Sequence, residues 1–186
     1  MIKGILVGIL LVVIGIAAMV YSYFSTGRAP VAVTDPEMPF ERLFANMGLH
    51  SYLNKLPHPA PPIAPDEPNM LAGAKLYKEH CAVCHGLPDA PKTAVADGMF
   101  PKPPQLFKGM GVTDDEPWES YWKISGGIRM TGMPGFKSHL SENQMWQIAL
   151  LVKNADKISP AVKAELTAQP APAAAPATAA PPSPKN

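Results

Sequence analysis

The chain has 186 residues, of which 47% are apolar and 23 are proline, and its formal net charge is +1. This length suits one modest folded domain with long attachments. A net charge so close to zero does not point to a nucleic acid or an acidic polymer as partner. The two cysteines lie too close together in the sequence to cross-link distant parts of a fold, so a structural disulfide is not expected.

The first segment, residues 1–28, contains an uncharged apolar run over residues 4–24. As a helix this run would span roughly 31 Å, against a hydrocarbon core of about 30 Å. A cleaved signal peptide is the alternative, but such peptides have shorter apolar regions and a small-residue cleavage site. Here the run ends in the aromatic stretch Tyr21 to Phe24, which is typical of a membrane–water interface. An uncleaved transmembrane anchor is predicted, and the single charges Lys3 and Arg28 are too balanced to orient it.

Three further segments flank the expected domain. Residues 29–56 have apolar spacings typical of short helices, either at the membrane surface or against the domain. Residues 57–68 are rich in proline and are expected to form a stiff, extended tether of roughly 37 Å. Residues 159–186 are mostly Ala and Pro and are expected to form a disordered tail. Residues 69–158 remain as the folded domain.

The motif that carries the chemistry is Cys81-Ala82-Val83-Cys84-His85, and C-x-x-C-H is the attachment pattern of c-type haem. If the segment is helical, residues three apart share one face, so both thiols reach the vinyl groups of one porphyrin. The adjacent histidine then falls under the iron. A thioredoxin-like redox pair would need a βαβ pattern, and a zinc site would need a second ligand pair. The motif therefore predicts one covalently bound haem c, attached at Cys81 and Cys84, with His85 as an iron ligand.

A haem iron takes either a sixth ligand, which suits electron transfer, or an open face, which suits binding of small molecules. The glycine-rich loop over residues 126–136 contains two methionines, Met130 and Met133. Thioether sulfur suits the sixth position, although methionine is also a common core filler. Pro134 and the neighbouring glycines indicate a tight loop whose backbone closely approaches another group.

These features resemble the class I cytochrome c family, in which an amino-terminal helix leads into C-x-x-C-H and a later loop supplies a methionine. The resemblance covers residues 69–158 and extends especially to the cytochrome subunits of haem-copper oxidases and periplasmic dehydrogenases. In these proteins the ligand lies in a loop similar to the Thr-Gly-Met-Pro sequence at residues 131–134. The resemblance implies an all-α haem domain and Met133 as the sixth ligand, with Met130 as the competitor.

The resemblance also gives a role to the stretch from Phe100 to Leu106. In family members a proline carbonyl in this region accepts a hydrogen bond from the proximal histidine, which would be His85. Pro104 is the first candidate and Pro103 the second, while a plain proline-rich surface loop is the alternative. Such a bond would fix the ring orientation and the basicity of the ligand without touching the iron.

Three helices are expected in the domain. The first, over residues 71–80, leads into the haem motif, and Gly73 resembles the small residue at which class I cytochromes pack this helix across the last one. The second is expected over residues 115–125. The last begins after Ser141, which forms an S-x-x-Q capping box with Gln144.

The resemblance implies an electron-transfer protein and no enzyme activity of its own. With His85 and Met133 both bound, the iron would stay low-spin and six-coordinate in both oxidation states, at a positive potential. One alternative is a small haem peroxidase or reductase, for which His139 and Arg129 are the candidate acid–base groups. The other is a gas sensor in which the bound gas molecule displaces Met133 from the iron.

Covalent haem attachment in bacteria takes place outside the cytoplasmic membrane. The expected topology is therefore a single pass through the inner membrane, with the N-terminus in the cytoplasm and the haem domain in the periplasm. The expected partners are electron donor and acceptor proteins of a respiratory chain. The protein would act as a tethered shuttle or as a subunit of a larger membrane complex, with no nucleic acid as partner.

Overall fold

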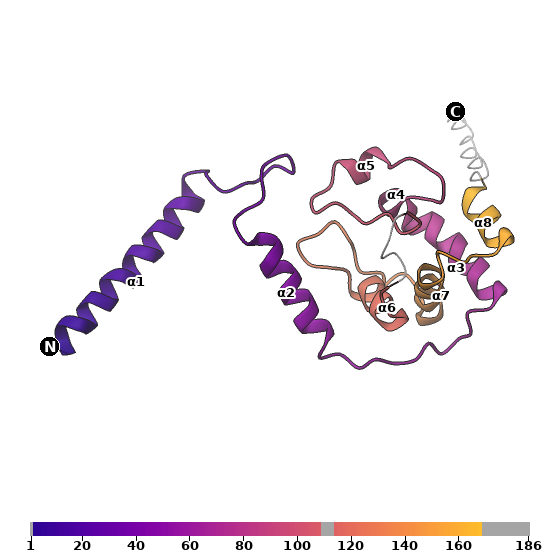
Figure 1. Ribbon diagram of the computed structural model, residues 1–186, viewed down its shortest axis with the longest axis horizontal. Helices are drawn as coiled ribbons and strands as arrows, with labels where there is room; N and C mark the ends of the chain where they lie inside the picture. Colours follow the sequence, from indigo (N-terminus) through magenta and orange to yellow (C-terminus); the bar gives the residue numbers. More distant parts are fainter. Residues whose placement is uncertain (1, 109–113, 169–186) are drawn as a thin grey trace, which may run out of the picture.

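The computed structural model describes residues 2–108 and 114–168, and within them all regular structure is helical (Figure 1). The predicted all-α fold class is therefore confirmed. The helices are, in chain order, α1 (Ile2–Ser25), α2 (Glu41–Leu53), α3 (Glu67–His80), α4 (Ala82–His85), α5 (Ala94–Asp97), α6 (Pro117–Gly126), α7 (Glu142–Lys153) and α8 (Pro160–Thr167).

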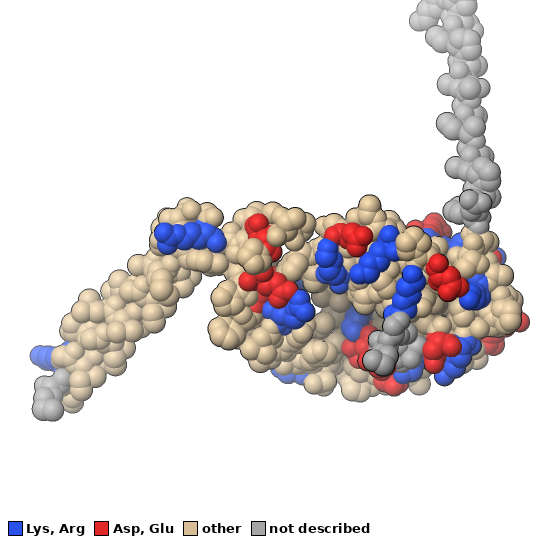
Figure 2. Space-filling view, turned by 45° about the horizontal axis from the view of Figure 1, so that its top comes forward, with Lys and Arg blue, Asp and Glu red and all other residues tan. Residues whose placement is uncertain are grey.

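Helix α1 projects away from the folded domain (Figure 1). It is 24 residues long and contains an 18-residue stretch with a mean hydropathy of 2.7, and none of its residues is buried within the protein. Lys and Arg side chains lie near its two ends only (Figure 2). The helix is thus long and apolar enough to cross a membrane, a property that it shares with signal sequences.

Helix α3 begins earlier than predicted because Asp66 caps it. The Asp66 carboxylate accepts a hydrogen bond from the backbone N–H of Asn69 at 3.0 Å, and Pro68 occupies the first turn, where its missing N–H costs nothing. The last two residues of the expected tether, 67 and 68, therefore belong to this helix. The helix ends at His80, directly before the cysteine–histidine motif.

The predicted capping box starts α7. The Ser141 backbone N–H donates to Gln144 Oε1 at 2.8 Å, and the Gln144 N–H donates to Ser141 Oγ at 3.3 Å, so two otherwise unpaired helix donors are satisfied. Most of the helix is buried, and it packs against both α3 and α6. The Trp146 ring stacks on Tyr121 of α6 with ring centroids 4.3 Å apart, which joins the two helices.

The crossing of α3 over α7 is close because residue 73 is glycine. A Cβ atom at Gly73 would lie 2.4 Å from the carbonyl oxygen of Gln147, well inside van der Waals contact. The predicted packing of the first helix across the last is confirmed at this point. The two backbones approach each other directly, and the buried residues of both helices form one core.

The structure differs from the sequence expectation at the start of the C-terminal tail. Residues 160–167 of the expected tail form α8, which packs on α3. Val162 and Leu166, one helical turn apart, are 1% and 0% exposed, and the Lys78 ammonium donates to the backbone carbonyl of Glu165 at 2.6 Å. The rest of the expected tail, residues 169–186, lies outside the described residues.

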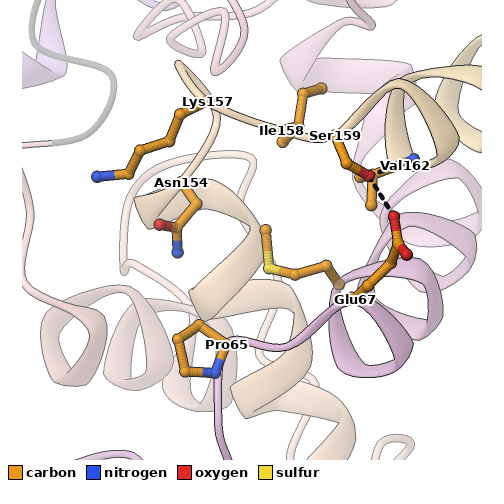
Figure 3. A pocket seen from close by; sticks show the side chains of 8 residues that line it. Pro65, Glu67, Asn154, Lys157, Ile158, Ser159 and Val162 are labelled. Atoms are coloured by element: carbon orange, nitrogen blue, oxygen red, sulfur yellow. Dashed lines mark hydrogen bonds between the residues drawn. The ribbon is translucent and has the colours of Figure 1, made fainter.

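The start of α8 is linked to the start of α3. Ser159 Oγ accepts a hydrogen bond from the Val162 N–H at 3.3 Å and donates one to Glu67 Oε1 at 2.7 Å (Figure 3). A cavity of about 170 Å³ lies beside this contact and reaches Met70 and Asn154. These contacts make α8 part of the folded domain.

The proline-rich segment follows the surface of the domain and does not stand free as a spacer. The His58 ring stacks on Trp118 of α6 with centroids 3.9 Å apart. Just before the segment, Tyr52 at the end of α2 contacts Trp122 with centroids 5.2 Å apart, and Leu53 is 2% exposed. The aromatic side chains of α6 explain this docking, because they offer apolar surface to the chain that precedes the domain.

We expect Gly73→Ala to lower the free energy of unfolding of the haem-loaded protein by about 1–3 kcal/mol, because the added methyl group forces α3 away from α7. Chemical denaturation followed by circular dichroism measures this. Gly48→Ala in α2 is the matched control, since nothing lies within 4 Å of the Cβ position there. It should leave the stability of the domain unchanged or raise it slightly. Equal stabilities of the two variants would contradict the close crossing.

Candidate haem site

The cysteine–histidine motif forms a short turn of helix at the end of α3. Cys81 lies between the two helices, as the C-cap of α3 and the N-cap of α4, and its N–H donates to the Tyr77 carbonyl at 2.9 Å. The His85 N–H donates back to the Cys81 carbonyl at 2.9 Å. Helical hydrogen bonding over the motif meets the condition under which Cys81 and Cys84 share one face.

The side chain of His85 is hydrogen-bonded to the proline-rich loop over residues 100–106. Its Nδ1 lies 2.8 Å from the carbonyl oxygen of Pro104, a hydrogen bond in which the ring N–H donates. Burial lowers the pKa of His85, and the hydrogen bond to Pro104 opposes that shift. A neutral ring with its proton on Nδ1 presents the lone pair of Nε2 for coordination. The partner is Pro104, the first of the two candidate prolines, and its effect on an iron ligand stays a prediction.

The environment of Cys81 is unlike that of a redox-active thiol. Burial, with a smaller contribution from Cys84, raises the pKa of Cys81 to about 12. Reactive cysteines have lowered pKa values, because the thiolate is the species that attacks. The site therefore does not favour thiol–disulfide exchange, which agrees with cysteines that serve as attachment points.

Three side chains that the sequence did not single out for this purpose support the turn. Gln105 Nε2 donates to the Cys84 carbonyl at 3.0 Å, and Thr93 Oγ1 donates to the Val83 carbonyl at 2.5 Å. Tyr77 Oη donates to the Gly86 carbonyl at 2.9 Å. Burial, followed by the effect of the Cys81 thiol, raises the pKa of Tyr77 above its usual range, so the phenol stays protonated and keeps donating.

Close backbone contacts define the loop that follows α6. Gly127, with φ of 67°, ends the helix, and a Cβ atom there would lie 2.6 Å from the backbone nitrogen of Gly135. The Phe136 N–H donates to the Ile124 carbonyl at 2.9 Å, and the Ile128 N–H donates to the Met133 carbonyl at 3.2 Å. The tight loop indicated by the glycines and Pro134 therefore folds back on the carboxyl end of α6.

The two methionines of this loop have different surroundings. Met130 has φ of 61°, and 92% of its surface is exposed. Met133 is partly buried and packs against the core cluster that Cys81 and Leu106 also contact. Its backbone N–H donates to Thr131 Oγ1 at 3.1 Å, which fixes the residue within the loop. Burial thus favours Met133 over Met130, and its role as iron ligand stays a prediction.

The residues of the site fit a haem by the chemistry of their donor groups. Cys81 and Cys84 supply two thiols one helical turn apart, and His85 supplies a neutral imidazole whose orientation is fixed. Met133 supplies a thioether from another segment that packs on the same core. Other partly buried apolar side chains pack on this core as well, among them Leu76, Leu87, Leu106, Phe107, Trp118, Tyr121 and Phe136. Thiols, an imidazole and a thioether at an apolar core are what a c-type haem requires.

Charges of both signs are interspersed over the face of the domain in Figure 2. The basic residues that flank the predicted haem loops, Lys102, Lys108, Arg129 and Lys137, are exposed. In Figure 2, Asp and Glu side chains are mixed with the Lys and Arg side chains, so the face in view has no extended field of one sign. Arg129 and His139, the candidate acid–base groups of an enzyme, are both exposed at the surface.

A match to a family model supports a cytochrome c domain in this part of the chain. Residues 68–152 match the model of the family described as cytochrome c oxidase, cbb3-type, subunit III. A chain of the reducing HAO-like protein complex from Kuenenia stuttgartiensis is 25% identical, over 57% of this chain and 54% of that one, with a TM-score of 0.45. The chain thus aligns with about half the length of that solved structure. None of the curated proteins matches the sequence.

We expect Tyr77→Phe to lower the free energy of unfolding by about 1–3 kcal/mol, because it leaves the buried Gly86 carbonyl without its donor while keeping the shape of the ring. Denaturant titration of the haem-loaded protein measures the change. Tyr52→Phe is the matched control, since Tyr52 is 53% exposed, and it should shift stability by less than about 0.5 kcal/mol. A Tyr77→Phe protein as stable as this control would show that the hydrogen bond does not support the turn.

Proposed function

We propose that this chain is a membrane-anchored monohaem cytochrome that carries single electrons between respiratory redox partners, and the match of residues 68–152 to a cytochrome c family model supports this proposal. The observation that carries the proposal is the hydrogen bond from His85 to the Pro104 carbonyl at the C-x-x-C-H turn. Burial favours the neutral imidazole, and the hydrogen bond fixes its tautomer and orientation, so that Nε2 is available to bind iron. When bound, the haem supplies one-electron exchange between ferrous and ferric iron.

In this proposal Cys81 and Cys84 would hold the haem through two thioether links, and His85 and Met133 would bind its iron. Backbone hydrogen bonds join the loop of Met133 to α6. Hydrogen bonds from Gln105 and Thr93 fix the turn that contains His85. Fixed ligands limit the rearrangement that accompanies a change of oxidation state. Fast electron exchange follows from this rigidity.

The same residues should raise the reduction potential. Thioether sulfur from Met133 is a weaker donor to ferric iron than a second imidazole would be. The apolar core around Cys81 and Met133 disfavours the additional charge of the ferric state. A positive midpoint potential is therefore expected, which suits a role late in a respiratory chain.

The proposed location of the protein is supported by its first helix and by the proposed haem. Helix α1 meets the length and hydropathy of a membrane span. Because covalent haem attachment in bacteria takes place outside the cytoplasmic membrane, the domain would face the periplasm. The N-terminus would then lie in the cytoplasm, and donor and acceptor proteins would meet the domain at the membrane, either freely or within one complex.

We expect Met133→Ala to abolish the near-infrared sulfur-to-iron charge-transfer band of the ferric protein, because that band requires a methionine bound to the iron. The midpoint potential should fall on the order of 100 mV, within the range of about 0.8 V that axial ligands control. Absorption spectra and a redox titration measure both effects. Met130→Ala is the matched control and should change neither.

Loss of the band in Met130→Ala instead would show that the ligand is misassigned, while leaving electron transfer in place. Rapid binding of carbon monoxide by the unmodified ferrous protein would contradict a stable sixth ligand. That result would favour the gas sensor or the small haem enzyme.

We expect the mature protein purified from membranes to retain residues 1–28 and to carry one haem, because α1 acts as an anchor and not as a signal peptide. Intact mass spectrometry of the detergent-solubilised protein measures both properties. A mature chain that begins after about residue 24, or a mass that requires a second haem, would contradict the anchored monohaem cytochrome.

A further inference from the structure

Exposed apolar side chains gather in the short region between α1 and the haem domain. From residue 26 to residue 52 the large exposed apolar residues are Val31, Val33, Phe40, Leu43, Phe44, Met47 and Tyr52. In the much longer described part that follows, they are only Val83, Val95 and Met130. Scattered apolar residues on a surface need no explanation, but a cluster of this kind marks an interaction surface.

Helix α2 has two apolar faces, and only one of them is covered by protein. At about 100° per residue, Leu43, Phe44 and Met47 fall within one arc of about 100°, and Leu49 and Leu53 lie about 130–170° from its centre. Leu53 is 2% exposed, whereas the first three are 54–60% exposed. We call the arc of Leu43, Phe44 and Met47 the outer face of α2.

The inner side of α2 is attached to the haem domain through its C-terminal end. Beyond the contact of Tyr52 with Trp122, the chain continues along α6 to the stacked pair of His58 and Trp118. A cavity of about 180 Å³ with an apolar lining separates this segment from α6, and its lining includes Leu56. The position of α2 relative to the domain therefore rests on aromatic contacts of the described residues.

The other end of α2 connects to the candidate membrane span by a compact link. The Asp35 carboxylate accepts hydrogen bonds from the backbone N–H groups of Val31 and Ala32, both at 2.8 Å. The Glu41 carboxylate accepts one from the Met38 N–H, also at 2.8 Å. In Figure 1, α2 runs across the direction of α1, as a helix in the membrane plane does beside one that spans it.

We propose that α2 lies in the surface of the lipid bilayer, with its outer face among the lipid chains and its inner side holding the haem domain. The proposal rests on the proposed membrane anchor, because α1 within the bilayer would keep α2, which follows it by a short link, near the bilayer surface. Arg42 is the one Lys or Arg of α2 and pairs with Glu37, so attraction to anionic lipid contributes little. Apolar burial in a neutral lipid surface is what this face fits.

The consequence concerns how the cytochrome reaches its partners. A domain held by α2 and by the docked proline-rich segment stays at the membrane surface and does not swing at the end of a free spacer. Donor and acceptor proteins must then present their redox centres close to the bilayer.

The test uses the full-length, haem-loaded protein in phosphatidylcholine vesicles. Single spin labels are placed through Phe44→Cys and Met47→Cys on the outer face, through Ala45→Cys on the other side of α2, and through Ile9→Cys in α1. The two native cysteines should be consumed by the haem thioethers. Relaxation of each label by oxygen, which concentrates in lipid, is compared with relaxation by a water-soluble nickel chelate.

We expect the oxygen-to-nickel ratio at positions 44 and 47 to be several-fold higher than at position 45, and to be unchanged when anionic lipid is added. Equal ratios at the three positions would overturn the proposal. Labels at 44 and 47 that are shielded from both reagents would overturn it as well, because a protein surface would then cover the outer face.

Position 9 separates this proposal from the proposed function. A label at 9 that lies in lipid, together with water-exposed labels at 44 and 47, leaves the membrane-anchored cytochrome intact and refutes the surface helix alone. A water-exposed label at 9 would refute the anchor and with it this inference. The near-infrared band of the same samples reports the haem ligation independently.

Discussion

The fold depends on the direct approach of α3 to α7 at Gly73, where any side chain would collide with the Gln147 carbonyl. From that crossing α3 runs straight into the turn of Cys81–His85. On its other flank α7 supports α6 by stacking of Trp146 on Tyr121, and the loop with Met133 is bonded to the end of α6. Both proposed iron ligands are therefore positioned by the same helix pair, through short connections that leave little freedom.

The parts of the fold that sequence could predict are those with local signals. The capping box at Ser141 marks the start of α7 within the sequence itself, and the uncharged run of α1 needs no partner to be recognised. Helix α8 was not predicted because Val162 and Leu166 are only two apolar anchors in an Ala/Pro-rich segment, and their burial depends on α3. Residues 29–56 are expected either at the membrane or against the domain. In the structure, α2 has one apolar side toward the domain, with Leu53 buried, and the exposed outer face that we propose lies in lipid.

The residues of the candidate haem site also fall into those with a local sequence signal and those that only the fold brings together. The pattern from Cys81 to His85 is contiguous, so it can be read without a structure, and the likeness to class I cytochromes suggested Pro104. Both methionines lie in one loop; the likeness to class I cytochromes favoured Met133, and in the structure Met133 is partly buried whereas Met130 is exposed. The hydrogen bond from Gln105 to the motif has no sequence signature, because it forms only where the fold brings two loops together.

The most direct test of the account is the proton NMR spectrum of the ferrous protein. A methionine bound to haem iron places its methyl group over the porphyrin ring, whose ring current shifts that signal far upfield. Of the ten methionines in the chain, one methyl signal should show this shift, and it should disappear in Met133→Leu. Ten methionine methyl signals at ordinary positions in the haem-loaded protein would contradict ligation by methionine and, with it, the electron-transfer role proposed for the chain.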